Sequence, residues 1–144
     1  MSLSDIFNVA GSGMNAQSIR LNTTASNIAN AESASSSVDA VYRGRHPVFA
    51  AVQSAMMDDG YLNPANEEPV GVGVMGIVES NAPLQKRYEP QHPEADQDGY
   101  VYYPNVNIVE EMTNMISASR SFQVNVEVMN SAKQMMQRVL TLGQ

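Results

Sequence analysis

Two short motifs in the middle of the sequence have the residue types of a ligand-binding loop, and the first is glycine-rich. Residues 71–76, GVGVMG, match the G-x-G-x-x-G pattern of dinucleotide-binding turns. That chemistry needs a helix that begins at the last glycines, so that backbone amides face the pyrophosphate. Residues 77–85, IVESNAPLQ, contain a proline and show no helical spacing. We therefore interpret residues 71–76 as part of a strand and expect no cofactor there.

The second motif is acidic. Residues 94–99, EADQDG, resemble the first half of an EF-hand calcium loop, which places acids at alternate positions before a glycine. Position 12 of such a loop must be a bidentate Glu, whereas here it is Asn105. His46 and His92 have no ligand partner at metal-binding spacing, and no serine lies in a recognisable nucleophile motif. The sequence predicts a solvated turn, no metal site and no enzyme activity.

Composition narrows the class of protein further. The chain of 144 residues allows one modest domain, and its lack of cysteine excludes disulfides and cysteine-based zinc sites. A formal net charge of -7 argues against nucleic acid as a partner, because phosphate backbones are bound by clustered Lys and Arg. No apolar run approaches the roughly 20 residues that cross a bilayer, so we expect no direct membrane insertion. The amino terminus does not have the pattern of a cleaved signal peptide.

Both ends of the chain have helical spacing. Apolar and small residues recur at steps of three and four near the amino terminus, which predicts a helix over residues 3–31. Asn107 followed by Glu110 forms a capping box for a second helix over residues 108–142, about 50 Å long. The large apolar residues that we expect to pack against other helices or subunits are Phe7, Met14, Leu21, Ile28, Met112, Met115, Phe122, Met129 and Met136.

The middle of the chain has strand and turn patterns. Residues 32–40 are serine-rich and predict a flexible connector. Val- and Tyr-rich stretches follow, at residues 41–52, 69–80, 84–90 and 99–104, and predict one small antiparallel sheet, with turns at residues 56–69 and 91–99. The expected fold class is α+β. Residues 1–31 and 105–144 form a coiled-coil-like helical hairpin, residues 32–40 a connector, and residues 41–104 a small β-rich domain.

Charge is scarce on both predicted helices. Residues 1–31 contain two charged side chains, Asp5 and Arg20, whereas residues 39–103 contain fourteen. Asn, Ser and Thr, as in TASNIAN at residues 24–30, take the place of surface charges, and burying such groups costs little once they are hydrogen-bonded. We therefore expect both helices to be enclosed by protein, and to be poorly ordered in the dilute monomer until subunits assemble. Strong protection of both ends against amide hydrogen exchange in the monomer would contradict this.

The few charges also suggest a register for the helix pair. If the two helices are antiparallel with both termini at one end, Asp5 lies near Arg138, and Arg20 lies toward Glu127. This hypothesis rests only on the pairing of opposite charges.

The two ends together resemble a known family. AGSGMNAQSIRLNTTASNIANAE near the start and MISASRSFQVNVEVMNSAKQMMQRVLTLGQ at the end are similar to the paired terminal signatures of bacterial flagellar axial proteins. The short length and the stretch YEPQHPEADQDGYVYYPNVNIVEEM resemble the proximal rod proteins of the basal body, the FlgC type. The residues that match the family's two motifs, and that the resemblance places in helix packing or subunit contacts, are Asn27, Asn30, Arg120, Phe122, Gln123 and Asn125.

The resemblance implies a structural subunit of the flagellar rod, which assembles helically in the periplasm and transmits motor torque. It also implies its partners: other copies of the chain, other rod proteins, the basal-body adaptor, the inner-membrane ring, and the type III export apparatus, which would export it without a cleaved signal. The T-x-G-Y sequence that often follows the first motif in longer relatives is absent here. A hook or secretion-needle subunit and a small soluble enzyme are the alternatives.

Overall fold

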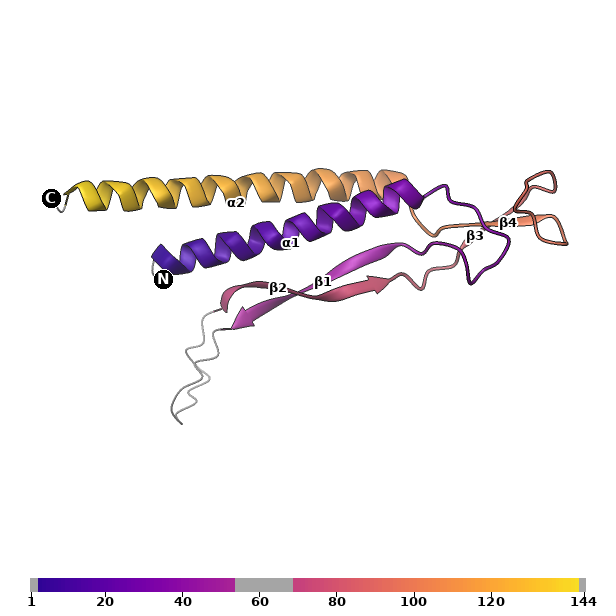
Figure 1. Cartoon of the computed structure of the whole chain (residues 1–144), viewed down its shortest axis with the longest axis horizontal. Helices are drawn as coiled ribbons and strands as arrows, with labels where there is room; N and C mark the ends of the chain where they lie inside the picture. The colour runs from indigo at the N-terminus through magenta and orange to yellow at the C-terminus, as the bar shows by residue number, and fades with distance from the viewer. Residues whose placement is uncertain (1–2, 54–68, 143–144) are drawn as a thin grey trace, which may run out of the picture.

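Two long antiparallel helices form the body of the molecule. The computed structural model describes residues 3–53 and 69–142. Helix α1 spans Leu3–Asn30 and helix α2 spans Ile108–Leu142, and they lie side by side with both termini at the same end (Figure 1). The α+β fold class with a helical hairpin is confirmed. Among the described helices, none is long and apolar enough to cross a membrane.

The start of α2 carries the predicted cap. The side-chain Oδ1 of Asn107 accepts hydrogen bonds from the backbone N–H groups of Val109, at 3.1 Å, and Glu110, at 3.4 Å. These are two of the amides at the start of a helix that have no intrahelical partner. Glu110 and Glu111 lie in the first turn, where the helix dipole favours negative charge.

Four strands form where the sequence predicts them, but they make two sheets instead of one. Strands β1, Arg45–Gln53, and β2, Pro69–Glu79, pair antiparallel, and we call this pair the ribbon. Strands β3, Gln85–Tyr88, and β4, Tyr100–Tyr103, form a second two-stranded sheet. The predicted single sheet is wrong because β2 and β3 do not pair and the ribbon lies along α1 instead (Figure 1). The predicted turn at residues 56–69 lies almost wholly outside the described residues.

The helices and the ribbon make three layers with α1 in the middle. Helix α1 packs against α2 and against both strands of the ribbon, whereas α2 and the ribbon do not pack on each other in the described part of the chain (Figure 1). Gly71 of β2 allows the close approach, because a Cβ at this position would lie 2.5 Å from Oγ of Ser12. The same hydroxyl accepts a hydrogen bond from the backbone N–H of Val72 at 3.1 Å.

The serine-rich segment after α1 is held by β4. Ser35 forms an isolated antiparallel bridge with Tyr102, with both backbone N–H···O distances at 3.0 Å. The sequence predicts a flexible connector over residues 32–40, and these two hydrogen bonds instead fix its middle to the second sheet.

Buried side chains concentrate at the end of the helix pair that lies away from the termini. Buried residues from α1, the connector, β4 and the start of α2 meet there, and they are Thr23, Thr24, Asn27, Ala31, Val41, Val101, Tyr103, Val106 and Glu111. Toward the termini the buried residues of the two helices are small, namely Ala10, Ala16, Ala118 and Ala132. A single copy therefore has its core at one end.

Candidate functional site

The core at this end is organised around one asparagine. Asn27 is fully buried, and its Nδ2 donates to the backbone oxygen of Arg45 at 2.8 Å and to Oε2 of Glu111 at 3.1 Å. Its Oδ1 accepts from the hydroxyl of Tyr42 at 2.8 Å and from the backbone N–H of Arg45 at 2.9 Å. A carboxamide has two N–H donors and two acceptor lone pairs, so every one of them is used. Asn27 thus joins α1, the start of β1 and the start of α2.

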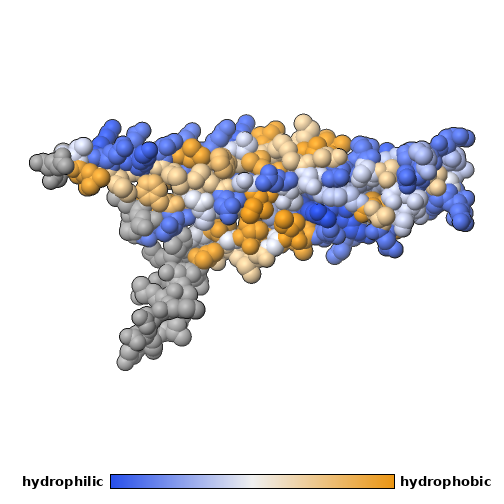
Figure 2. Space-filling model, in the orientation of Figure 1, coloured by the Kyte–Doolittle hydropathy of each residue, from blue (hydrophilic) through white to orange (hydrophobic). Residues whose placement is uncertain are grey.

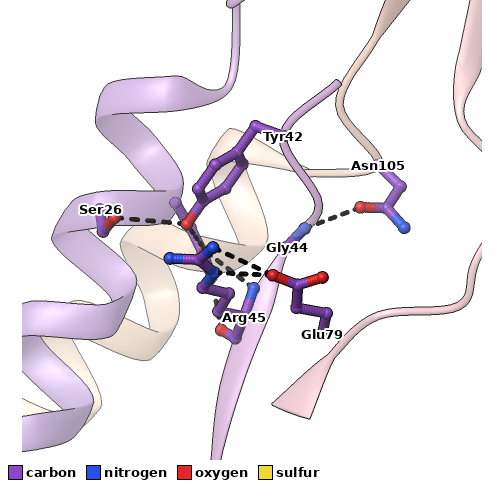
Figure 3. A network of polar contacts seen from close by, with 7 residues as sticks. Ser26, Tyr42, Gly44, Arg45, Glu79 and Asn105 are labelled. Carbon is purple, nitrogen blue, oxygen red and sulfur yellow. Dashed lines mark hydrogen bonds and ion pairs between the residues drawn. The ribbon is translucent and has the colours of Figure 1, made fainter. Parts of the chain in front are cut away.

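Arg45 extends this network toward the surface (Figure 3). Its guanidinium makes two hydrogen bonds to Oε1 of Glu79, its partner across the ribbon, at 3.0 and 3.2 Å. The guanidinium also lies 5.3 Å from the ring centre of Tyr42, whose hydroxyl is 3.3 Å from that of Ser26. The Arg45–Glu79 pair is half exposed and contributes little stability by itself, but it fixes the register at one end of the ribbon.

Asn105 makes three further hydrogen bonds at the same end of the ribbon. Its Oδ1 accepts from the backbone N–H of Gly44 at 2.8 Å, a bond that Figure 3 shows. Its Nδ2 donates to the backbone oxygens of Ser80, at 3.1 Å, and Ala82, at 2.9 Å. Asn105 therefore ties the residue before β1 and the residues after β2 to the start of α2. We call the residues Asn27, Tyr42, Arg45, Glu79, Asn105 and Glu111 the junction.

Beyond the junction, the two helices pack through small and polar side chains. A Cβ added at Gly13 would lie 2.8 Å from Nδ2 of Asn125, and one at Gly11 would lie 3.9 Å from the terminal methyl of Met129. Gly13 therefore lies where a side chain of α2 approaches closely, whereas a side chain at Gly11 would meet only ordinary van der Waals contact.

The predicted charge register is wrong for Arg20. Its guanidinium donates to Oδ1 of Asn114 at 3.0 Å, so it lies more than three helical turns from Glu127. The predicted proximity of Asp5 and Arg138 stays a prediction. Heptad spacing looks the same after a shift of seven residues, so charge pairing alone could not set this offset.

The residues predicted for helix packing or subunit contacts fall into two groups. In a single copy, Asn27 is buried and a second set is partly buried: Phe7, Met14, Leu21, Ile28, Asn30, Met115, Phe122, Asn125 and Met129. Four residues of α2 are exposed, namely Met112, Arg120, Gln123 and Met136. Asn30 donates from Nδ2 to the backbone oxygen of Ser26 at 2.8 Å, which is a bond within α1. The role of both groups in contacts between subunits stays a prediction.

The motifs that could bind ligands have structural explanations. Gly71 and Gly73 lie in β2, where Gly71 contacts α1 and Gly73 contacts Val52 of β1, and no helix follows them. In the acidic loop, Oδ1 of Asp96 accepts from the backbone N–H groups of Asp98, at 2.9 Å, and Tyr100, at 2.8 Å. Gly99 has a φ of 81°, which glycine adopts easily, so the loop is a tight turn that leads into β4. The predictions that residues 71–76 belong to a strand and that residues 94–99 form a turn are confirmed.

The second sheet carries an aromatic and basic surface. Nζ of Lys86 lies 3.8 Å from the ring centre of Tyr100, and the guanidinium of Arg87 lies 4.4 Å from that of Tyr103. The hydroxyl of Tyr103 donates to Oε2 of Glu89 at 3.1 Å. Burial raises the pKa of Tyr103, and the hydrogen bond to Glu89 and its negative charge raise it further.

Comparison with known proteins identifies the family. The family model "Flagella basal body rod protein" matches residues 7–32, and "Flagellar basal body rod FlgEFG protein C-terminal" matches residues 97–142. The flagellar basal-body rod protein FlgC of Salmonella typhimurium is 46% identical over the whole length of both chains. FlgC of Borreliella burgdorferi is 36% identical, over all of this chain and 99% of its own. The chain belongs to the FlgC family of flagellar basal-body rod proteins.

Membership in this family confirms the resemblance seen in the sequence. The two alternatives, a hook or secretion-needle subunit and a small soluble enzyme, are not favoured. The two matched segments of the FlgC-type chain contain Asn27, Asn105 and Glu111 of the junction. Tyr42, Arg45 and Glu79 lie between the two segments. Sequence reasoning missed these three and Asn105, because their types are ordinary in turns and strands. The sequence offered one signal, since Arg45 and Glu79 have opposite charges and belong to two predicted strands joined by a predicted turn.

Proposed function

We propose that this structural subunit of the flagellar basal-body rod assembles helically, with copies of itself and with related rod proteins, into the drive shaft that transmits motor torque. The observation that supports helical assembly is the large apolar surface on α2. Seven of its large apolar side chains are exposed in a single copy, and they are Val109, Met112, Ile116, Val124, Val128, Met135 and Val139. We call these residues the α2 stripe. A long unpartnered apolar surface on a soluble helix marks a protein contact.

The form of the molecule suits a shaft. Torque spread over contacts along a 35-residue helix loads each contact weakly, so the shaft resists twisting without any single strong bond. The junction would keep the ribbon at a fixed position along the helix pair, because Asn27 and Asn105 connect both to the start of α2. A rigid subunit transmits rotation better than one whose ribbon can swing.

The resemblance to axial proteins extends the proposal to location and partners. The chain is exported by the flagellar type III apparatus without a cleaved signal peptide and forms part of the rod in the periplasm. There it contacts the basal-body adaptor and the inner-membrane ring, as well as other rod proteins. It needs no cofactor and catalyses no reaction.

Deletion and complementation in the bacterium that carries this chain test the proposal. Loss of the gene should abolish swimming and leave basal bodies without a complete rod. Phe122→Ala should lower incorporation into isolated basal bodies more than export, because it removes helix packing at a partly buried position. Val38→Ala, in the exposed connector, serves as the control and should behave as wild type. Normal swimming and intact rods after deletion would refute the proposed function.

A further inference from the structure

The open side of α1 carries a row of exposed carboxamides. Gly13 faces α2, where its Cβ would lie 2.8 Å from Nδ2 of Asn125. Asn15 follows Gly13 by two residues, or about 200° around the helix, so it lies on the side of α1 turned away from α2. Asparagines recur on this side at a spacing of seven residues, and an alanine continues the line. We call these residues, all of them exposed, the α1 row: Asn8, Asn15, Asn22 and Ala29.

The outer side of α2 carries a similar row. Gln123 precedes Asn125 by two residues, so it lies about 200° around α2 from the side that meets Gly13. Carboxamides again recur at a spacing of seven residues, and an isoleucine of the α2 stripe continues the line toward the junction. We call these residues, all of them exposed, the α2 row: Ile116, Gln123, Asn130 and Gln137. Figure 2 shows hydrophilic side chains on this outer side of α2 toward its C-terminal end.

Neither row has a partner within one copy. Each row lies on the side of its helix that is turned away from the other helix, and none of the six carboxamides forms a hydrogen bond within the described part of the chain. A carboxamide both donates and accepts, so Asn and Gln can bond to one another, and burying them costs little once they are bonded. A solvated helix face usually carries Lys and Glu instead. The two rows therefore have the chemistry of a contact surface.

From these observations we infer that the α1 row of one copy packs against the α2 row of a second copy. The inference rests on the proposed function and names the surfaces that it uses. Two copies that point the same way bring α1 of one antiparallel to α2 of the other, so the rows run in opposite directions along the contact. In this direction they match at four positions: Asn8 with Gln137, Asn15 with Asn130, Asn22 with Gln123, and Ala29 with Ile116. A second copy is the partner because its own α2 supplies the complementary order, three carboxamides and then an apolar residue.

The residues beside the α1 row allow a helix to approach. Ser18 and Ala25 each lie three positions after an asparagine of the row, so they are next to it on the helix surface. Small side chains let two helix axes come close, which shortens the distance between facing carboxamides. This side of α1 therefore suits a helix as its partner.

The match between the rows sets the offset between the copies. Within one copy Gly13 lies against Asn125, so Asn15 is level with Gln123. Pairing Asn15 with Asn130 instead moves the second copy by seven residues, or about 10.5 Å, along the helix axis. Neighbouring copies are therefore staggered.

A level contact without this shift matches the rows less well. The apolar Ile116 would then face the carboxamide of Asn22, and Gln137 would face no asparagine of the row. A contact between two different surfaces of identical subunits is heterologous, and it continues from copy to copy. Because each step also shifts along the axis, the array forms a helix and not a flat ring.

Cysteine cross-linking in isolated basal bodies tests the contact and its offset, since the chain has no cysteine of its own. Each variant replaces the native chain, and the particles are oxidised with copper phenanthroline, because a disulfide requires Cα atoms within about 7 Å of each other. Asn15→Cys with Asn130→Cys should give dimers and larger products, as should Asn22→Cys with Gln123→Cys. Asn15→Cys with Gln123→Cys is the matched control for a level contact and should give far fewer. Each single variant should stay monomeric.

Charge substitutions give an independent test in the same particles. Asn15→Lys places an unpaired charge in the contact and should lower the amount of the chain in basal bodies at least about tenfold. Adding Asn130→Glu supplies a partner for that charge and should restore most of the loss, whereas adding Gln123→Glu should not. All three positions are exposed in a single copy, so the urea midpoints of the free variants should stay near that of the wild type.

Three results would overturn the inference. Products from a single variant, at the yield of the double variant, would show that like rows meet. Products from the level pair alone would show a different offset. Assembled particles in which no pair cross-links, together with no rescue by Asn130→Glu, would show that the two rows do not meet. In each case the rod is still built, so the proposed function stands, whereas failure of that function would appear as normal swimming after deletion of the gene.

Discussion

Removing the side chain of Asn27 should destabilise the junction more than its size suggests. Asn27→Ala deletes all four hydrogen bonds of the carboxamide and leaves four partner groups behind. Tyr42 can still bond to Ser26, whose hydroxyl is 3.3 Å away, so its loss is small. The backbone N–H and C=O of Arg45 lose their partners, as does the carboxylate of Glu111, which is only 5% exposed.

The size of the effect follows from these groups. A buried polar group without a partner costs about 1 to 3 kcal/mol, and more when it is charged. The bonds to Arg45 are partly buried, and water can replace some of their strength, so we assign about 1 kcal/mol to each. With about 2 kcal/mol for Glu111, the expected loss in free energy of unfolding is about 4 kcal/mol.

Two further variants separate the lost hydrogen bonds from the lost volume. Asn27→Asp keeps the shape and both acceptor roles of Oδ1, but it removes the Nδ2 donor and places a second carboxylate beside Glu111. Because like charges disfavour ionisation, the introduced carboxyl has a raised pKa in the folded state. Its penalty should be largest at neutral pH and should shrink as the pH falls and the group becomes protonated. Asn30→Ala, whose main bond lies within α1, is the control and should cost much less.

Urea unfolding followed by far-ultraviolet circular dichroism gives the free energies. Asn27→Ala at pH 7 should lower the midpoint strongly, and Asn30→Ala only slightly. A loss below about 1 kcal/mol for Asn27→Ala, equal to that of the control, would refute the reasoning, because it would mean that water reaches every group in the junction. A penalty for Asn27→Asp that does not change with pH would also refute the reasoning.

Other positions give sharper comparisons within the same fold. Gly11→Ala should stabilise the helix pair by about 0.5 to 1 kcal/mol, since alanine favours helix and its Cβ meets only ordinary van der Waals contact. Gly13→Ala should lose this gain, because its Cβ would press on the amide of Asn125, and equal gains in thermal unfolding would contradict the packing. The raised pKa of Tyr103 means that its contribution is complete below the usual value of 10.0 and is lost as the pH rises through the raised value. Tyr103→Phe, which also removes the bond to Glu89, should therefore flatten the decline of the urea midpoint above pH 10, and an unchanged decline would show that other groups cause it.

The helices could be predicted from sequence almost to the residue because the signals that define them are local. Spacing at three and four residues sets the apolar face of α1, and Asn107 marks the start of α2 through bonds to residues two and three positions away. The offset between the helices is not local, and the prediction that Arg20 lies toward Glu127 was wrong. That offset depends on pairs such as Gly13 with Asn125, which no periodic pattern identifies.

The same distinction explains the sheets and the junction. Each strand could be located from its own residues, whereas its partner could not, and one expected sheet became two. The family motif drew attention to Asn27, but two of its partners lie 15 and 18 residues along the chain and a third lies 84 residues away. Nothing in the types of Tyr42, Arg45 or Glu111 indicates that they meet. The junction becomes visible only when the fold brings three elements together.

The uncharged polar residues of TASNIAN therefore have a cause within one copy of the chain. Thr24 and Asn27 are buried in a single copy, Asn27 among Tyr42, β1 and α2, and a charge there would be buried without a partner. The scarcity of charge on α2 needs a different cause, because its outer valines and methionines are exposed in a single copy. If copies of the chain cover that side, the two ends of the helix pair meet different constraints. Near the junction the residue types suit burial within one copy, and toward the termini they suit contacts between copies. The backbone should therefore be most ordered at the junction, and the order should extend toward the termini as subunits join.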